Sequence, residues 1–250
     1  MMSMQKPLLL ALSLAAVNAY GETTKPWAVS TELGVIATSG NTETTSIQAK
    51  IDAKQTTERW HNHYVLTALF KEDQVTQEDG SKIKEKTAEK YFGSAKAAYQ
   101  LQREHSNLFL YGAHTDDQFG AYRRYSTVAL GYGDRLFDGE TMHLDVEIGP
   151  GYFRAEKVLA DESLEKETGV LLRGAAAYLW KISEAAEFTQ TLSVESAEEN
   201  TRTVAETALT TRINSALQLK VGVNLSNDSD VAPGKEKTDT MSYVNLVYQF

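Results

Sequence analysis

The stretch LQLKVGVNL (residues 217–225) alternates apolar and polar residues without a break. Leucine and valine occupy the odd positions, while Gln218, Lys220, Gly222 and Asn224 occupy the even ones. Successive side chains of a β-strand point to opposite faces. The stretch therefore predicts a strand with one apolar face and one polar face.

The same pattern recurs from residue 26 to the end of the chain. Its segments are about ten to fifteen residues long, which exceeds the five to six of an average soluble strand and suits the roughly 9–11 of a membrane strand. Only Pro26, Pro150 and Pro233 interrupt this part of the chain, and aromatic residues such as Trp27 and Trp60 lie near segment ends, where an interfacial girdle would place them. A soluble sandwich would bury the apolar faces between two sheets. The long segments favour an all-β fold, a transmembrane antiparallel up-and-down β-barrel of about 12 strands.

The links between these segments alternate in expected length. Short links are expected near residues 56–58, 103–105, 138–140, 183–184 and 214–215. Longer charged links are expected at residues 73–85, 115–124, 157–167, 196–202 and 227–239, and residues 39–41 form a short exception. Short turns on one side and long loops on the other are typical of a barrel inserted from one side.

The N-terminus has the features of an export signal. Lys6 precedes the apolar run LLLALSLAAV (residues 8–17), and small or modest residues at 17 and 19 predict cleavage after Ala19. The run is too short for a membrane-spanning helix; a buried core helix is the alternative. We expect residues 1–19 to be a signal peptide and residues 20–250 to form the barrel.

Composition narrows the class of protein further. The 250 residues include no cysteine, which excludes disulfides and thiolate metal sites. The formal net charge of -9 argues against nucleic acid as a partner. The mean hydropathy of -0.38 is still compatible with a barrel, because half of each strand faces the interior.

Several stretches resemble a known family. Residues 33–42, 130–133 and 147–152 are similar to the YdiY-like family of salt-induced outer membrane proteins, and so is the approach to the aromatic last strand. The resemblance covers essentially the whole mature chain. It implies an outer-membrane barrel without an established molecular activity, and it supplies no catalytic residues.

The polar strand faces supply the candidate site. Charged residues there would line the lumen, and the candidates are Glu32, Lys50, Asp52, Lys96, Asp145, Glu147, Arg173, Glu195, Glu206, Arg212 and Lys220. Enclosed charges must be paired or solvated. A network of ion pairs would give a structural or stress-related barrel with a narrow or plugged lumen, whereas a water-filled lumen would give a small-solute channel.

Metal and catalytic sites are less favoured. His61 and His63 share a strand face and could hold a metal if a third ligand were near. His143, Asp145 and Glu147 also share a face, and a lipid-modifying enzyme could use such a histidine with Thr191 or Ser193. Because His143 would point inward, away from lipid, we do not expect an enzyme. Because the chain has no cysteine and the sequence shows no acidic third partner for His61 and His63, we expect no metal or cofactor site.

The last strand ends in Tyr248 and Phe250, on one face. This ending resembles the assembly signal of outer-membrane barrels. We therefore expect the barrel-assembly machinery and outer-membrane lipid as partners, and the outer membrane of a Gram-negative bacterium as the location. The sequence leaves the oligomeric state and any solute open.

Overall fold

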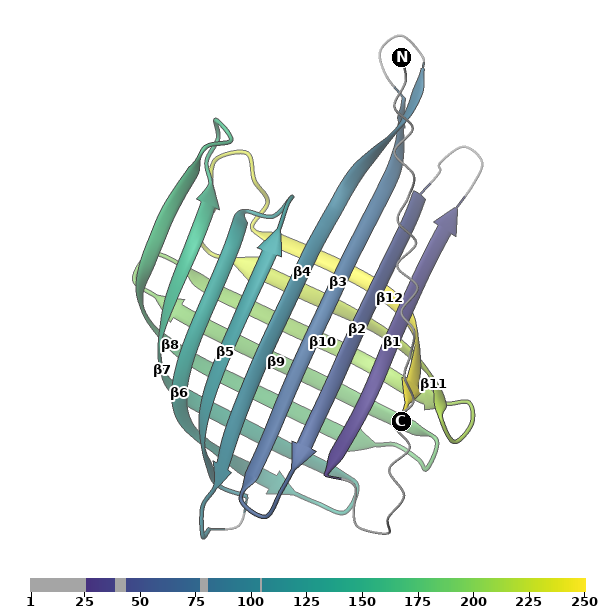
Figure 1. The fold of residues 1–250 in the computed structure, drawn as a ribbon, viewed down its shortest axis with the longest axis vertical. Helices are drawn as coiled ribbons and strands as arrows, with labels where there is room; N and C mark the ends of the chain where they lie inside the picture. Colours follow the sequence, from purple (N-terminus) through teal and green to yellow (C-terminus); the bar gives the residue numbers. More distant parts are fainter. Residues whose placement is uncertain (1–25, 39–43, 77–80, 104) are drawn as a thin grey trace.

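The computed structural model describes residues 26–38, 44–76, 81–103 and 105–250. Twelve β-strands account for nearly all of them (Figure 1). Their bounds are β1 Trp27–Thr38, β2 Thr44–Thr56, β3 Trp60–Thr76, β4 Lys82–Gln100, β5 Asn107–Asp117, β6 Tyr122–Asp138, β7 Met142–Val158, β8 Leu164–Lys181, β9 Ala186–Ala197, β10 Thr201–Arg212, β11 Leu217–Asp228 and β12 Thr238–Gln249. The expected signal peptide and the link at residues 39–41 lie outside the described residues.

Every strand pairs antiparallel with its neighbours in the chain, and β1 also pairs with β12, so the sheet closes on itself. The predicted antiparallel barrel of 12 strands is confirmed. None of the described residues forms a helix long and apolar enough to cross a membrane.

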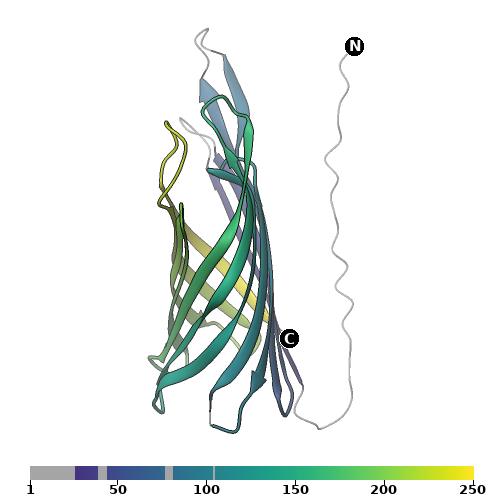
Figure 2. The same cartoon turned by 90° about the vertical axis from the view of Figure 1, so that its left-hand side faces the viewer.

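The barrel is flattened. Figure 2 shows it edge-on and narrower than in Figure 1, where β1–β5 form one wall and β9–β12 cross behind them in the opposite wall. The first residue of β1 and the last of β12 lie at the same end. We call this the termini end, and we call the opposite end, which carries the β5–β6, β7–β8 and β11–β12 links, the hairpin end.

The exposed outer surface is apolar and the interior is charged. Leu130 is 63% exposed and Val170 is 73% exposed, whereas Glu32 is 7% exposed and Lys220 is 9% exposed. A water-soluble protein buries leucine and valine and exposes glutamate and lysine. The reversed arrangement suits a barrel surrounded by hydrocarbon.

Aromatic side chains gather around the termini end. Trp27 stacks with Tyr64 at 5.9 Å between ring centroids, and Trp60 meets Tyr99 at 5.3 Å. Further contacts of this kind join Tyr178 to Phe188 and Tyr248 to Phe250. Aromatic residues favour the boundary between hydrocarbon and water, so this ring places the boundary at the ends of the strands.

The predicted alternation of short and long links is wrong. Among the described residues, the links at the hairpin end shrink to residues 118–121, 159–163 and 198–200, while residues 229–237 form a longer loop. The charged stretches that were expected to be loops are continuations of the strands. For example, β3 and β4 pair as far as Thr76 and Lys82. Charged residues are stable in such strands because the strand ends reach beyond the apolar band into water.

Two glycines allow β6 and β7 to approach closely. A Cβ atom on Gly149 would lie 2.0 Å from the carbonyl oxygen of Leu130, and one on Gly131 would lie 2.2 Å from that of Ile148. The ladder is interrupted there, next to Pro150, and resumes at Ala129↔Gly151. Only glycine fits at these two positions.

Candidate functional site

A cavity of about 860 Å³ occupies the half of the lumen nearest the termini end. All twelve strands contribute to its lining. Charged and histidine side chains form a large part of the lining, among them Lys54, His61, Asp134, Arg135 and Glu187. The arrangement follows from the two-residue period of the strands, which turns every second side chain inward.

A first group of ion pairs lines this cavity next to the junction of β1 and β12. We call Glu32, Lys50, Glu206 and Lys220 the seam cluster. Lys220 lies 2.8 Å from Glu206 and 3.2 Å from Glu32, and Lys50 lies 3.5 Å from Glu32. The Asn245 amide donates to Glu32 at 3.0 Å, and the Tyr243 hydroxyl donates to Glu206.

A second group spans the other side of the lumen. We call Lys96, Glu147, Arg173 and Glu195 the Arg173 cluster. Arg173 lies 3.4 Å from Glu147 and 3.7 Å from Glu195, and its guanidinium stacks 4.0 Å from the centroid of the Tyr111 ring. Lys96 on β4 reaches Glu147 on β7, past β5 and β6. Thr127 donates to Glu195 at 2.9 Å.

Each of the two clusters has no net charge. Each contains two carboxylates and two cations, and all eight are lumen-lining candidates from the sequence. Paired charges in an interior are strongly coupled, because removing one partner leaves the other buried and alone, at a cost of about 3–5 kcal/mol. The clusters therefore hold the walls together as a set.

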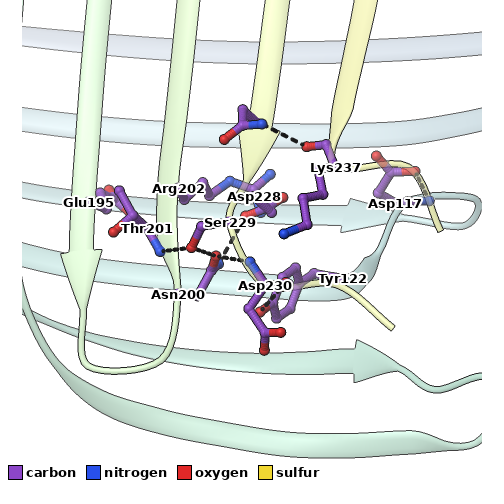
Figure 3. A network of polar contacts seen from close by, with 12 residues as sticks. Asp117, Tyr122, Glu195, Asn200, Thr201, Arg202, Asp228, Ser229, Asp230 and Lys237 are labelled. Atoms are coloured by element: carbon purple, nitrogen blue, oxygen red, sulfur yellow. Dashed lines mark hydrogen bonds and ion pairs between the residues drawn. The ribbon is translucent and has the colours of Figure 1, made fainter. Parts of the chain in front are cut away.

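A third network closes the hairpin end (Figure 3). The Asn200 amide donates to Asp228 at 3.0 Å and accepts the backbone N–H of Asp230 at 3.1 Å. Asp230 lies at the start of loop 229–237 and pairs with Lys157 on β7, while the Tyr122 hydroxyl of β6 donates to its carbonyl oxygen at 3.3 Å. The loop is thereby tied to β6 and β7.

Opposite walls also meet directly near this network. The guanidinium of Arg202 on β10 lies 4.6 Å from the centroid of the Tyr125 ring on β6. Tyr122, Tyr125, Phe153 and Leu171 form a buried apolar group beside it. The lumen is thus crossed by side chains at this level as well.

The remaining lumen candidates lie outside the two clusters. Asp52 contacts His63 at 2.9 Å and Lys50 at 3.6 Å. Asp145 pairs with Arg135 at 2.7 Å. Arg212 is exposed at the termini end of β10.

The histidines face the cavity, but the structure gathers no metal site around them. His61, His63 and His143 all line the cavity. Asp52 is the acidic neighbour of His63 that the sequence did not reveal, because it comes from the adjacent strand. Among the described residues, no group of three or more histidine and carboxylate side chains could hold a metal ion.

The triplet considered for catalysis is divided between two sets of partners. His143 lies 3.7 Å from Asp145, which is itself held by Arg135, while Glu147 belongs to the Arg173 cluster. Thr191 lines the same cavity, and Ser193 lies two residues further along its strand.

Sequence reasoning missed several residues that complete the clusters. Tyr111, Thr127 and Arg202 occupy inward positions of their strands, so the two-residue period could have found them. The partnership of Asp230 with Lys157 had no signal in the sequence, because it joins a loop to a strand 73 positions away.

Comparisons with known proteins agree with this architecture. The chain is 30% identical over 225 residues to the uncharacterized protein YdiY of Escherichia coli (strain K12), covering 90% of this chain and 83% of YdiY. Its fold is similar to that of the COG4313 outer membrane channel from Pseudomonas putida F1, with a TM-score of 0.50, 10% identity and coverage of 90% and 94% of the two chains. The translocator domain of autotransporter NalP from Neisseria meningitidis gives a TM-score of 0.49 at 13% identity, with 92% and 90% covered. The model of a family described as a protein of unknown function, DUF481, matches residues 31–250, and the chain belongs to this family.

Proposed function

We propose that the protein is a structural barrel of the Gram-negative outer membrane, with a lumen closed by paired side chains. One observation carries the proposal: ion pairs and ring contacts link non-adjacent strands across the lumen, as from Lys96 to Glu147 and from Arg202 to Tyr125. A continuous aqueous path would require these contacts to separate. Each separation would leave charges without partners in the interior.

The direct test is conductance of the purified protein in planar bilayers. We expect no steady unitary currents from the natural protein. A general porin inserted into the same bilayers shows that the assay detects an open lumen. Steady unitary currents from the natural protein would refute the closed lumen.

A small-solute channel is the second candidate, and the cavity favours it. A cavity of about 860 Å³, lined in part by charged side chains, already occupies half of the lumen. In that case, only the two clusters and the network at the hairpin end would need to move. The same conductance measurement decides between the two functions.

We also propose that the C-terminal strand directs assembly. Tyr248 is 45% exposed and Phe250 is 51% exposed on the outer surface, where another protein could contact them. Both belong to the aromatic ring at the termini end, the side that would face the periplasm.

A further inference from the structure

The junction between β1 and β12 is paired along only part of its length. Four ladder pairs join the two strands, from Ser30↔Gln249 to Leu33↔Leu246, and the Phe250 N–H donates to Val29. On their other sides the same strands are fully paired: β1 with β2 from residue 27 to 38, and β12 with β11 from 238 to 248. The two strands separate toward the hairpin end (Figure 1).

This leaves two facing strand edges without ladder partners at the junction, residues 34–38 of β1 and 238–245 of β12. We call this part of the junction the open seam. Unpaired backbone groups cannot face hydrocarbon, since each costs several kcal/mol there. The edges therefore need polar groups beside them.

A side chain occupies the narrow end of the open seam. A Cβ atom on Gly34 would lie 2.3 Å from the Asn245 Oδ1 atom, so the amide packs against the bare backbone of β1. The same amide donates to Glu32. The Asn245 amide and the Val244 carbonyl oxygen, 3.3 Å from the same Cβ position, thus fill the space beside Gly34 where the ladder stops.

The outer rim of the open seam is apolar, whereas its lumen side is charged. Leu33, Val35, Val244 and Leu246 are about half exposed on its outer rim. The seam cluster lies directly inside, with Glu32 on β1 and Lys220 on β11 both buried. An amphipathic molecule matches this arrangement, with its hydrocarbon tail along the rim and its charged head group toward the lumen.

We propose that the open seam is a lateral opening that admits the head group of a membrane lipid from the bilayer into the lumen. This inference rests on the proposal that the barrel lies in a bilayer. It goes beyond the proposal of a closed lumen, because the opening leads through the wall of the barrel and not along its axis. A β-strand from another protein fits less well. An added strand must lie about 4.8 Å from both edges along its length, whereas these edges diverge.

Disulfide trapping tests the geometry, and the chain has no cysteine of its own. A pair at Leu33→Cys and Leu246→Cys joins residues that are ladder partners, and a mild oxidant should crosslink it in the membrane. A pair at Val35→Cys and Val244→Cys continues the same register into the open seam and should remain reduced. Equal crosslinking of both pairs would overturn the open seam.

Quenching by phosphatidylcholine that carries a nitroxide on its head group tests for the lipid. A bimane label at Met241→Cys lies on the unpaired part of β12, on the inner face shared with Tyr243. The control label at Ala113→Cys is also inward, because Ala113 pairs with the buried Thr127 on the far side of the barrel. We expect loss of bimane fluorescence at position 241 and none at 113.

Equal fluorescence at the two labels would overturn lipid entry. A dimer crosslinked through Val35→Cys, without quenching at 241, would do the same and would identify a second copy of the chain as the occupant. Conductance does not enter either readout, so a failure here is separate from a failure of the closed lumen.

Discussion

Replacement of Arg173 by methionine tests how the clusters stabilise the barrel. Arg173 is 6% exposed and is the only cation within ion-pair distance of Glu195 among the described residues. Methionine fills much of the same space, so the main effect is electrostatic. Glu195 would keep hydrogen bonds from neutral hydroxyls, such as that of Thr127, but would lose its cation. We expect the free energy of unfolding to fall by about 3–5 kcal/mol, more than about a hundredfold in the unfolding equilibrium.

The measurement is urea unfolding of the protein in lipid vesicles, followed by tryptophan fluorescence. The double variant Arg173→Met with Glu195→Gln should recover part of the loss, because it also removes the stranded carboxylate. Arg154→Met is the matched control: Arg154 is exposed on β7, and its loss should change stability by less than about 0.5 kcal/mol. If Arg173→Met behaves like the control, or if the double variant shows simple additivity, the clusters do not act through paired charges.

Three further substitutions test other parts of the structure. Asp230→Asn removes the charge that pairs with Lys157. A protease should then cleave faster within residues 229–237 of the intact protein in vesicles. Unchanged cleavage would contradict the network at the hairpin end. Gly149→Val places side-chain atoms against the carbonyl oxygen of Leu130, so the folded, faster-migrating band should be absent from unheated gels. The control is Gly174→Ala, which should leave that band intact because a Cβ atom there meets no atom within 4 Å. Removal of Phe250 should reduce the fraction reaching the outer membrane in cells more than it reduces refolding in vesicles; equal losses in both would argue against recognition by an assembly machinery.

The strands were predictable because their period is imposed by geometry. A side chain in a strand points one way or the other, so residues 217–225 had to present leucine and valine on one face. The exposed Val221 and the buried Lys220 show which face turned outward. The strand ends were less predictable, since charged residues at the ends of β3 and β4 resemble those of a loop and only their ladder partners reveal a strand.

The partnerships inside the lumen could not be predicted in the same way. Neighbouring strands in the chain are neighbours in the sheet, so the contact of Lys50 with Glu32 follows from the hairpin. The contact of Lys96 with Glu147 depends instead on how far the barrel flattens and on the stagger of strands that never touch. The alternation of apolar and polar residues predicts neither the flattening nor the stagger.

The partners in the seam cluster come from opposite ends of the chain. Glu32 and Lys220 are separated by 188 positions, so Glu32, which already pairs with Lys50 of the neighbouring strand, gains its second cation only when β11 is in place. Contacts of such long range form late in folding. Closure of the sheet and completion of the seam cluster are thus one event: until β12 docks on β1, the pair Glu32–Lys50 and the pair Glu206–Lys220 stay apart, and neither has its full set of partners.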